Sequence, residues 1–241
     1  MHEYLLPYLL LLAHFVSGAF WIIRINRSLK PTEARNQWIK YGMYLLLVNL
    51  IWCCLVWVPA VFPYIGWIVI LMAAFEWWKA LRKVKSRAWL SIAFLIVSGG
   101  FSGFLYMDQN ILLYTFFIVV LFDGSCQVAG QLIGKRPLLP RISPGKTIEG
   151  LFGGTLVTLA TSLATRRSFS FDWAELILTT CVIMAAAFTG DMLASAVKRK
   201  AKIATFGKMI PGHGGVIDRF DSLMMTGALL YLLTHIRHFL G

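Results

Sequence analysis

Long apolar segments are the feature that most constrains this chain. A helix that crosses the hydrocarbon core of a bilayer needs about 20 consecutive, mostly apolar residues. Such segments follow one another along most of the 241 residues, and the chain is 58% hydrophobic but only 14% charged. Soluble domains carry roughly 25% charged residues, and a soluble protein would have no place for so much apolar surface. The sequence therefore predicts an all-α integral membrane protein.

We expect about eight transmembrane helices. The second and third are separated only by Pro59 to Pro63, which predicts a tight hairpin, and the sixth is rich in Gly and Thr and could be tilted or broken. The first apolar run has no basic segment before it and no small-residue cleavage site after it, so we expect it to be retained. The predicted spans are residues 4–23, 42–61, 64–81, 88–106, 110–130, 149–165, 173–193 and 223–239.

The basic residues predict the orientation of these spans. Of the 23 Lys and Arg residues, 20 lie in residues 24–40, 79–87, 131–148 and 194–222. Basic connections stay in the cytoplasm, which places these four segments inside and both termini outside. The net charge of +12 indicates an anionic partner, and for a membrane protein this is first the lipid headgroup layer. Because the basic residues are not interleaved with aromatic residues in polar stretches, we expect no nucleic-acid partner.

Charge, glycine and carboxylates gather in residues 190–222. Asp191, Ser195 and Lys198 are spaced i, i+4 and i+7 and therefore share one face of a helix, which Arg199 borders. A carboxylate, a hydroxyl and two cations on one stripe could hold a metal ion and a phosphate together. The alternative is a basic helix end that only touches anionic lipids.

A glycine-rich loop follows this helix. Gly214 and Gly215 beside His213 permit tight turns and expose backbone N–H groups, a shape suited to anions. Taken alone, the histidine is more often structural than catalytic.

Two further carboxylates begin the last span. Asp218 and Asp221 are spaced i, i+3, with Arg219 between them. Carboxylate oxygens on one helical face form the kind of site that Mg²⁺ prefers. Helix capping is the alternative, but it explains one aspartate more readily than these two together with Asp191.

Ionisable residues at membrane depth are costly and indicate function by default. Asp123 ends an apolar span on the predicted cytoplasmic side and is followed by Gly124. For Glu76 we favour a carboxylate near a helix end, close to Lys79 and next to Trp77 and Trp78, which anchor at the membrane interface.

A second polar loop, residues 141–154, opens the sixth span. Its Ser143-Pro-Gly-Lys146-Thr147 segment lacks the spacing and the preceding strand of a P-loop, which excludes a P-loop NTPase. Lys146 is well placed to meet a phosphate, whereas Thr147 and Glu149 could instead cap the helix.

These motifs resemble those of a known family. The pattern S-x-x-K-R from Ser195, followed by P-G-H-G-G-x-x-D-R-x-D from Pro211, is similar to the signature of phosphatidate cytidylyltransferases, the CDP-diacylglycerol synthases. Residues 143–150 and the Asp123-Gly124 pair also look like that family's. The resemblance covers roughly the C-terminal half of the chain.

The resemblance implies an enzyme of a bacterial inner membrane whose site faces the cytoplasm. The phosphate of phosphatidic acid, or of a related lipid phosphate, attacks the α-phosphorus of CTP and gives CDP-diacylglycerol and pyrophosphate. The family uses Mg²⁺, with a second cation such as K⁺ left open, and by analogy forms a homodimer. Its metal ligands map onto Asp191, Asp218 and Asp221. The phosphates would be neutralised by Lys146, Lys198, Arg199 and Arg219. Reacting groups would be oriented by Ser195 and His213. The expected substrate contacts are Asp123, Ser143, Lys146, Thr147, Gly214 and Gly215.

Two departures indicate a divergent member. Where the family usually has Glu and Lys-Asp, this chain has Ala194 and Ala204-Thr205, so one positive and two negative charges are absent. They put substrate identity and efficiency in question, and they keep open a catalytically weakened, lipid-binding homologue. A CTP-dependent lipid kinase of the polyprenol type is the enzymatic alternative. A transporter is disfavoured because the polar residues gather at one membrane face. We expect a scaffold in residues 1–109 and a catalytic region in residues 110–241.

Overall fold

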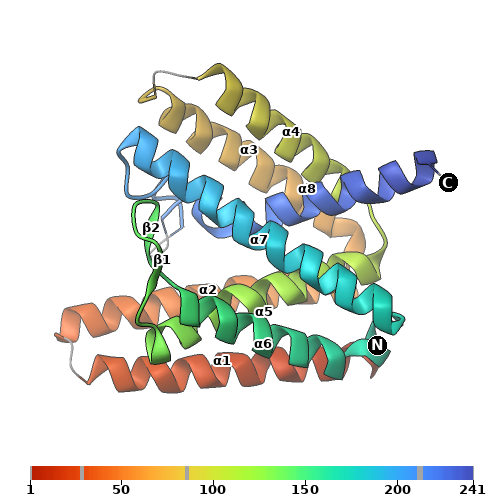
Figure 1. The fold of residues 1–241 in the computed structure, drawn as a ribbon, viewed down its shortest axis with the longest axis horizontal. Helices are drawn as coiled ribbons and strands as arrows, with labels where there is room; N and C mark the ends of the chain where they lie inside the picture. Colours follow the sequence, from red (N-terminus) through yellow and green to blue (C-terminus); the bar gives the residue numbers. More distant parts are fainter. Residues whose placement is uncertain (1, 28–29, 85–86, 211–213, 241) are drawn as a thin grey trace.

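A computed structural model describes residues 2–27, 30–84, 87–210 and 214–240, which form a bundle of α-helices with one short β-hairpin (Figure 1). The helices are α1 Leu5–Asn26, α2 Pro31–Trp57, α3 Phe62–Leu81, α4 Ala88–Phe104, α5 Gln109–Ile133, α6 Ile148–Ala164, α7 Trp173–Ala201 and α8 Ile217–Leu240. Strands β1, Pro137–Leu139, and β2, Ser143–Thr147, pair antiparallel. The predicted all-α class is confirmed, and the hairpin between α5 and α6 is an addition to it.

Each predicted span lies within or largely overlaps one helix. Within the described ranges, five helical segments are long and apolar enough to cross a membrane: α1, α2, α5, α7 and the segment Pro59–Leu81, which contains α3. Helices α4 and α6 have 17 residues each. The expected tight connection is a 3-10 turn at Pro59–Val61 that leads directly into α3. The suspected break in the sixth span is wrong, because α6 is one continuous helix from Ile148 to Ala164.

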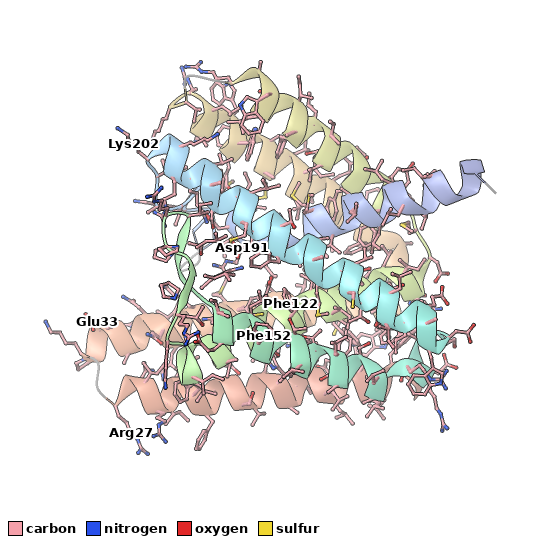
Figure 2. All side chains as sticks on the ribbon, in the orientation of Figure 1. Arg27, Glu33, Phe122, Phe152, Asp191 and Lys202 are labelled. Atoms are coloured by element: carbon pink, nitrogen blue, oxygen red, sulfur yellow. The ribbon has the colours of Figure 1, made fainter. Side chains whose placement is uncertain are left out.

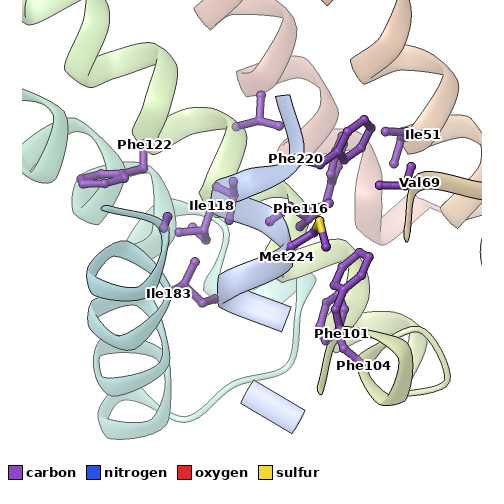
Figure 3. Packing of buried hydrophobic residues seen from close by; sticks show 14 of the residues in the cluster. Ile51, Val69, Phe101, Phe104, Phe116, Ile118, Phe122, Ile183, Phe220 and Met224 are labelled. Carbon is purple, nitrogen blue, oxygen red and sulfur yellow. The ribbon is translucent and has the colours of Figure 1, made fainter. Parts of the chain in front are cut away.

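The core surrounds α5 and the first half of α8. Twelve residues of α5 are buried, in line with its central position. Figure 3 shows Phe220 and Met224 of α8 among side chains of neighbouring helices, including Phe116 of α5 and Phe101 of α4. This packing fixes α8, which carries two of the predicted site aspartates.

Small residues let α5 and α6 approach closely. Gly150 and Gly154 lie four residues apart on α6 and face Cys126 and Gly130 of α5. A Cβ on Gly154 would lie only 2.7 Å from the backbone nitrogen of Cys126. Lipid tails are as apolar as the helix surfaces, so helices in a membrane associate through such close packing and through polar contacts.

Three buried hydroxyls supply a polar contact of this kind. The Tyr114 hydroxyl of α5 lies 2.8 Å from Ser162 Oγ of α6 and 2.5 Å from Thr180 Oγ1 of α7, and the last two are 2.9 Å apart. The cluster ties three helices together at a point from which water is excluded.

All four basic connections lie at one end of the bundle, and both termini lie near the other (Figure 1). The connections are α1–α2, α3–α4, the β-hairpin between α5 and α6, and α7–α8. This arrangement brings segments far apart in sequence to a common polar end.

We predict that Gly154→Ala lowers the free energy of unfolding by about 1–3 kcal/mol, because the added methyl group pushes α6 away from α5. Gly99→Ala is the matched control. It lies within α4 with no atom within 4 Å of its Cβ position, so it should be neutral or stabilise the helix by about 0.5–1 kcal/mol. Unfolding in mixed micelles with increasing dodecyl sulfate measures both, and equal midpoints would contradict the proposed contact.

Candidate active site

A cleft of about 870 Å³ opens near the basic end of the bundle, and it collects residues of α2, α5, the β2 segment, α7 and α8. Figure 2 shows Asp191 on the side of α7 that faces α5, whereas Lys202 lies at the end of that helix. Nine of the predicted site residues line the cleft: Asp123, Lys146, Thr147, Asp191, Lys198, Gly214, Asp218, Arg219 and Asp221.

Three helices contribute carboxylates to the deep part of the cleft. Asp123 of α5, Asp191 of α7 and Asp221 of α8 lie close enough to interact electrostatically. Ser222 of α8 lies beside Asp123 of α5, and both residues line the cleft. Gly190 allows this approach, since a Cβ there would lie 2.6 Å from the carbonyl oxygen of Asp221.

Lys146 places a positive charge among these carboxylates. Its ammonium group forms an ion pair with Asp191 and lies 5.3 Å from the centre of the Phe188 ring. Burial lowers the pKa of Lys146, but the carboxylates of Asp191, Asp123 and Asp221 raise it, and the net shift is upward from the ordinary value. Lys146 is therefore protonated at neutral pH.

Lys146 reaches the cleft because the hairpin ends directly at α6. Thr147 is the N-cap residue of α6, and its hydroxyl accepts a hydrogen bond from Gly150 N at 3.1 Å, as one alternative predicted. Glu149 lies in the first turn of α6, and its carboxylate also reaches back to the hairpin. Its Oε2 accepts hydrogen bonds from the backbone nitrogens of Lys135 and Arg136 and so anchors the start of the hairpin.

Asp218 organises the segment between α7 and α8. Its Oδ1 accepts a hydrogen bond from Lys198 Nζ at 2.7 Å. Its Oδ2 accepts from the backbone nitrogens of Phe206 at 2.9 Å and Gly215 at 3.0 Å. The side chain is 5% exposed, so these bonds are made away from water.

Other predicted residues lie around the cleft without lining it. Ser195 is buried and donates a long hydrogen bond of 3.4 Å to Asp191 Oδ1, which confirms that the two share a face of α7. Arg199 turns to the hairpin instead, where its Nε donates to the Ile142 carbonyl oxygen at 3.1 Å. Ser143 and Gly215 are not among the lining residues. His213 lies outside the described residues.

Helix α2 contributes a polar stripe that the sequence analysis missed. Gln37, Lys40, Tyr41 and Tyr44 all line the cleft. Their spacing of i, i+3, i+4 and i+7 places them on one helical face, and this periodicity was the available signal. The division into a scaffold, residues 1–109, and a catalytic region, residues 110–241, stays a prediction. Helix α2, which belongs to the expected scaffold, nevertheless lines part of the cleft.

The carboxylate oxygens of the cleft are the type of ligand that a hard cation prefers. Carboxylate oxygens are the ligands that Mg²⁺ prefers, and a positively charged group already lies among Asp123, Asp191 and Asp221. Within the described ranges, however, no three acidic, histidine or cysteine side chains are arranged to hold a metal ion. The assignment of metal ligands to Asp191, Asp218 and Asp221 therefore stays a prediction.

Comparison with known proteins finds one matching family and several bacterial relatives. The family described as "Cytidylyltransferase family" matches residues 8–237, so the similarity extends well beyond the C-terminal half. A protein of Staphylococcus haemolyticus named "Phosphatidate cytidylyltransferase" is 30% identical over 220 residues, which cover 78% of this chain and 83% of the relative.

Two other relatives match over shorter stretches. Proteins with the same name from Staphylococcus epidermidis and Staphylococcus aureus are 36% and 35% identical over 161 and 160 residues. In both cases the match covers 62% of this chain and 62% of the relative's length.

We predict that Asp218→Ala exposes the loop that the carboxylate anchors. The backbone N–H groups of Phe206 and Gly215 lose their acceptor, so their amide hydrogens should exchange at least about tenfold faster, in line with the loss of roughly 1.5–3 kcal/mol for hydrogen bonds to a charged group. Asp221→Ala is the control because neither N–H group bonds to it. Unchanged exchange at both amides would show that Asp218 does not anchor the loop.

Proposed function

The chain belongs to the Cytidylyltransferase family, and on this premise we propose that it transfers CMP from CTP to phosphatidic acid or a related lipid phosphate. A phosphate oxygen of the lipid attacks the α-phosphorus of CTP, the bond to the β-phosphate oxygen breaks, and CDP-diacylglycerol and pyrophosphate are formed. The observation that carries the proposal is the cleft at the basic end, where lysines and carboxylates meet beside apolar helices.

Phosphoryl-type transfer needs little covalent chemistry from a protein and depends mainly on alignment and charge neutralisation. Lys146, Lys198 and Arg219 line the cleft from three different elements, so they can contact separate phosphate groups. Arg199 is a weaker candidate because it bonds to the hairpin. Ser195 acts through Asp191, whose carboxylate it contacts.

We propose that Asp191 and Asp221 hold Mg²⁺, with Asp123 beside them. When bound, the ion would withdraw charge from phosphate oxygens and favour pyrophosphate as the leaving group. Asp218 already accepts hydrogen bonds from Lys198 and from two backbone N–H groups. We therefore propose that Asp218 anchors the loop, and we do not place it among the ligands of the metal ion. This changes the role that the resemblance alone implied.

We further propose that all eight helices span a bacterial inner membrane, with the cleft on the cytoplasmic side. The basic connections share one end, as the positive-inside rule requires. The two short helices also expose large apolar side chains, including Leu95 at 67% on α4 and Leu156 at 68% on α6. Such faces suit contact with lipid tails. The homodimer stays a prediction.

Labelled CTP tests the proposed reaction directly. We expect purified protein in phosphatidate-containing micelles with Mg²⁺ to transfer the α-phosphate label of CTP to lipid and to release pyrophosphate. Transfer of the γ-phosphate label instead would establish a lipid kinase. Lipid binding that survives a chelator, without transfer of either label, would establish a binding homologue and sink the enzyme proposal.

We predict that Asp191→Asn lowers turnover by at least about 100-fold, because it removes one charge from the proposed cation site and from the partner of Lys146. Asp172→Asn is the matched control, since this exposed residue precedes α7 at its other end and forms no capping hydrogen bond. Initial rates of CDP-lipid formation measure both variants. A similar rate for Asp191→Asn and the control would remove Asp191 from the site.

A further inference from the structure

Glu76 lies in α3, yet its carboxylate reaches the start of α8. The residue is 1% exposed, and its Oε2 accepts a hydrogen bond at 3.0 Å from the backbone nitrogen of Ile217, 141 residues later in the chain. Among the described residues, Oε1 has no hydrogen-bond partner. The sequence had favoured an interfacial position near Lys79, and the structure instead buries this carboxylate between elements.

Two glycines of the α7–α8 segment enclose the carboxylate. A Cβ on Gly207 would overlap Glu76 Oε1, and a Cβ on Gly215 would overlap Oε2. The carboxylate therefore fills the space that side chains at these positions would need. The neighbouring Trp77 adds a second contact, since its ring stacks on Phe206 with 5.9 Å between centroids.

The hydrogen bond to Ile217 also has an electrostatic reason. Ile217 is the first residue of α8, and the first N–H groups of a helix have no partner within the helix. A carboxylate is favoured there because the N-terminal end of a helix carries partial positive charge. Glu76 thus caps α8 from another helix, and it is not one of the residues that line the cleft.

We propose that Glu76 is a positioning residue for the active site. Asp218, Arg219 and Asp221 follow Ile217 directly, so the position of the first turn of α8 decides where these cleft residues lie. Asp218 accepts hydrogen bonds from Phe206 and Gly215, and Glu76 accepts one from Ile217 while it packs closely against Gly207 and Gly215. The kinetic part of this inference rests on the proposed function.

Two substitutions distinguish the effect of the length of the Glu76 side chain from the effect of its charge. Glu76→Asp keeps the charge but withdraws the carboxylate by one methylene, whereas Glu76→Gln keeps the length and an oxygen that can accept from Ile217. We expect Glu76→Asp to lower kcat per folded molecule at least about tenfold with KM for CTP within about twofold, and Glu76→Gln to stay within about threefold of the unchanged protein. Glu175→Ala, at an exposed site in the first turn of α7, is the control and should change neither.

A purely structural role predicts a different result. It would lower the unfolding midpoint and leave kcat per folded molecule unchanged, and that outcome for Glu76→Asp would overturn the proposal. A larger loss for Gln than for Asp would also overturn it, because charge rather than reach would then matter. Should Glu76→Asp fail to fold, Gly207→Ala presses a methyl group against the carboxylate without changing Glu76 and should lower kcat in the same way.

Amide hydrogen exchange tests the inference independently of any reaction. Exchange at Ile217 should be faster in Glu76→Asp than in the unchanged protein and nearly unchanged in Glu76→Gln. If the unchanged protein does not turn over CTP and phosphatidate, the proposed function fails while the exchange result still decides whether Glu76 holds α8. If it does turn over and Glu76→Asp is equally active, only the positioning role is lost.

Discussion

A charge buried near a membrane has to be compensated, and this requirement organises the polar end of the molecule. Three carboxylates there have partners on other elements of the chain. Asp191 pairs with Lys146, Asp218 pairs with Lys198 and two backbone N–H groups, and Glu76 accepts from the first N–H group of α8. Because an uncompensated charge would cost several kcal/mol, these contacts hold the α7–α8 segment and the hairpin in one arrangement.

The same contacts explain how a cleft can exist in a bundle that is otherwise closely packed. Farther from the basic end, small residues and buried aromatic side chains bring the helices together, as Gly154 does for α6 against α5. At the basic end, ion pairs and hydrogen bonds join the elements that line the cleft. Polar groups exposed there can exchange their protein partners for a phosphate, which an apolar interior could not do.

The sequence predicted the helices because span length and hydropathy are local properties. Helical spacing also predicted the shared face of Asp191 and Ser195, and a capping residue predicted the start of α6. Long-range contacts were not predictable in this way. Nothing near Glu76 in the sequence indicates that its partner is Ile217, and nothing near Arg199 indicates that its side chain bonds to the carbonyl oxygen of Ile142. The hairpin was missed because Ser143–Thr147 lacks the apolar alternation of a strand.

The departures from the family pattern matter less for the charge of the cleft than their number suggests. Among the described lining residues, four cations (Lys40, Lys146, Lys198 and Arg219) face four carboxylates (Asp123, Asp191, Asp218 and Asp221). Ala204 and Thr205 also line the cleft where the family usually has Lys-Asp, but that pair carries opposite charges, so its absence leaves the balance unchanged. Ala194 is buried at 6% exposure and does not line the cleft. The described lining therefore keeps equal numbers of cations and carboxylates, and of the three substituted positions Ala204 and Thr205 lie on the cleft wall whereas Ala194 does not.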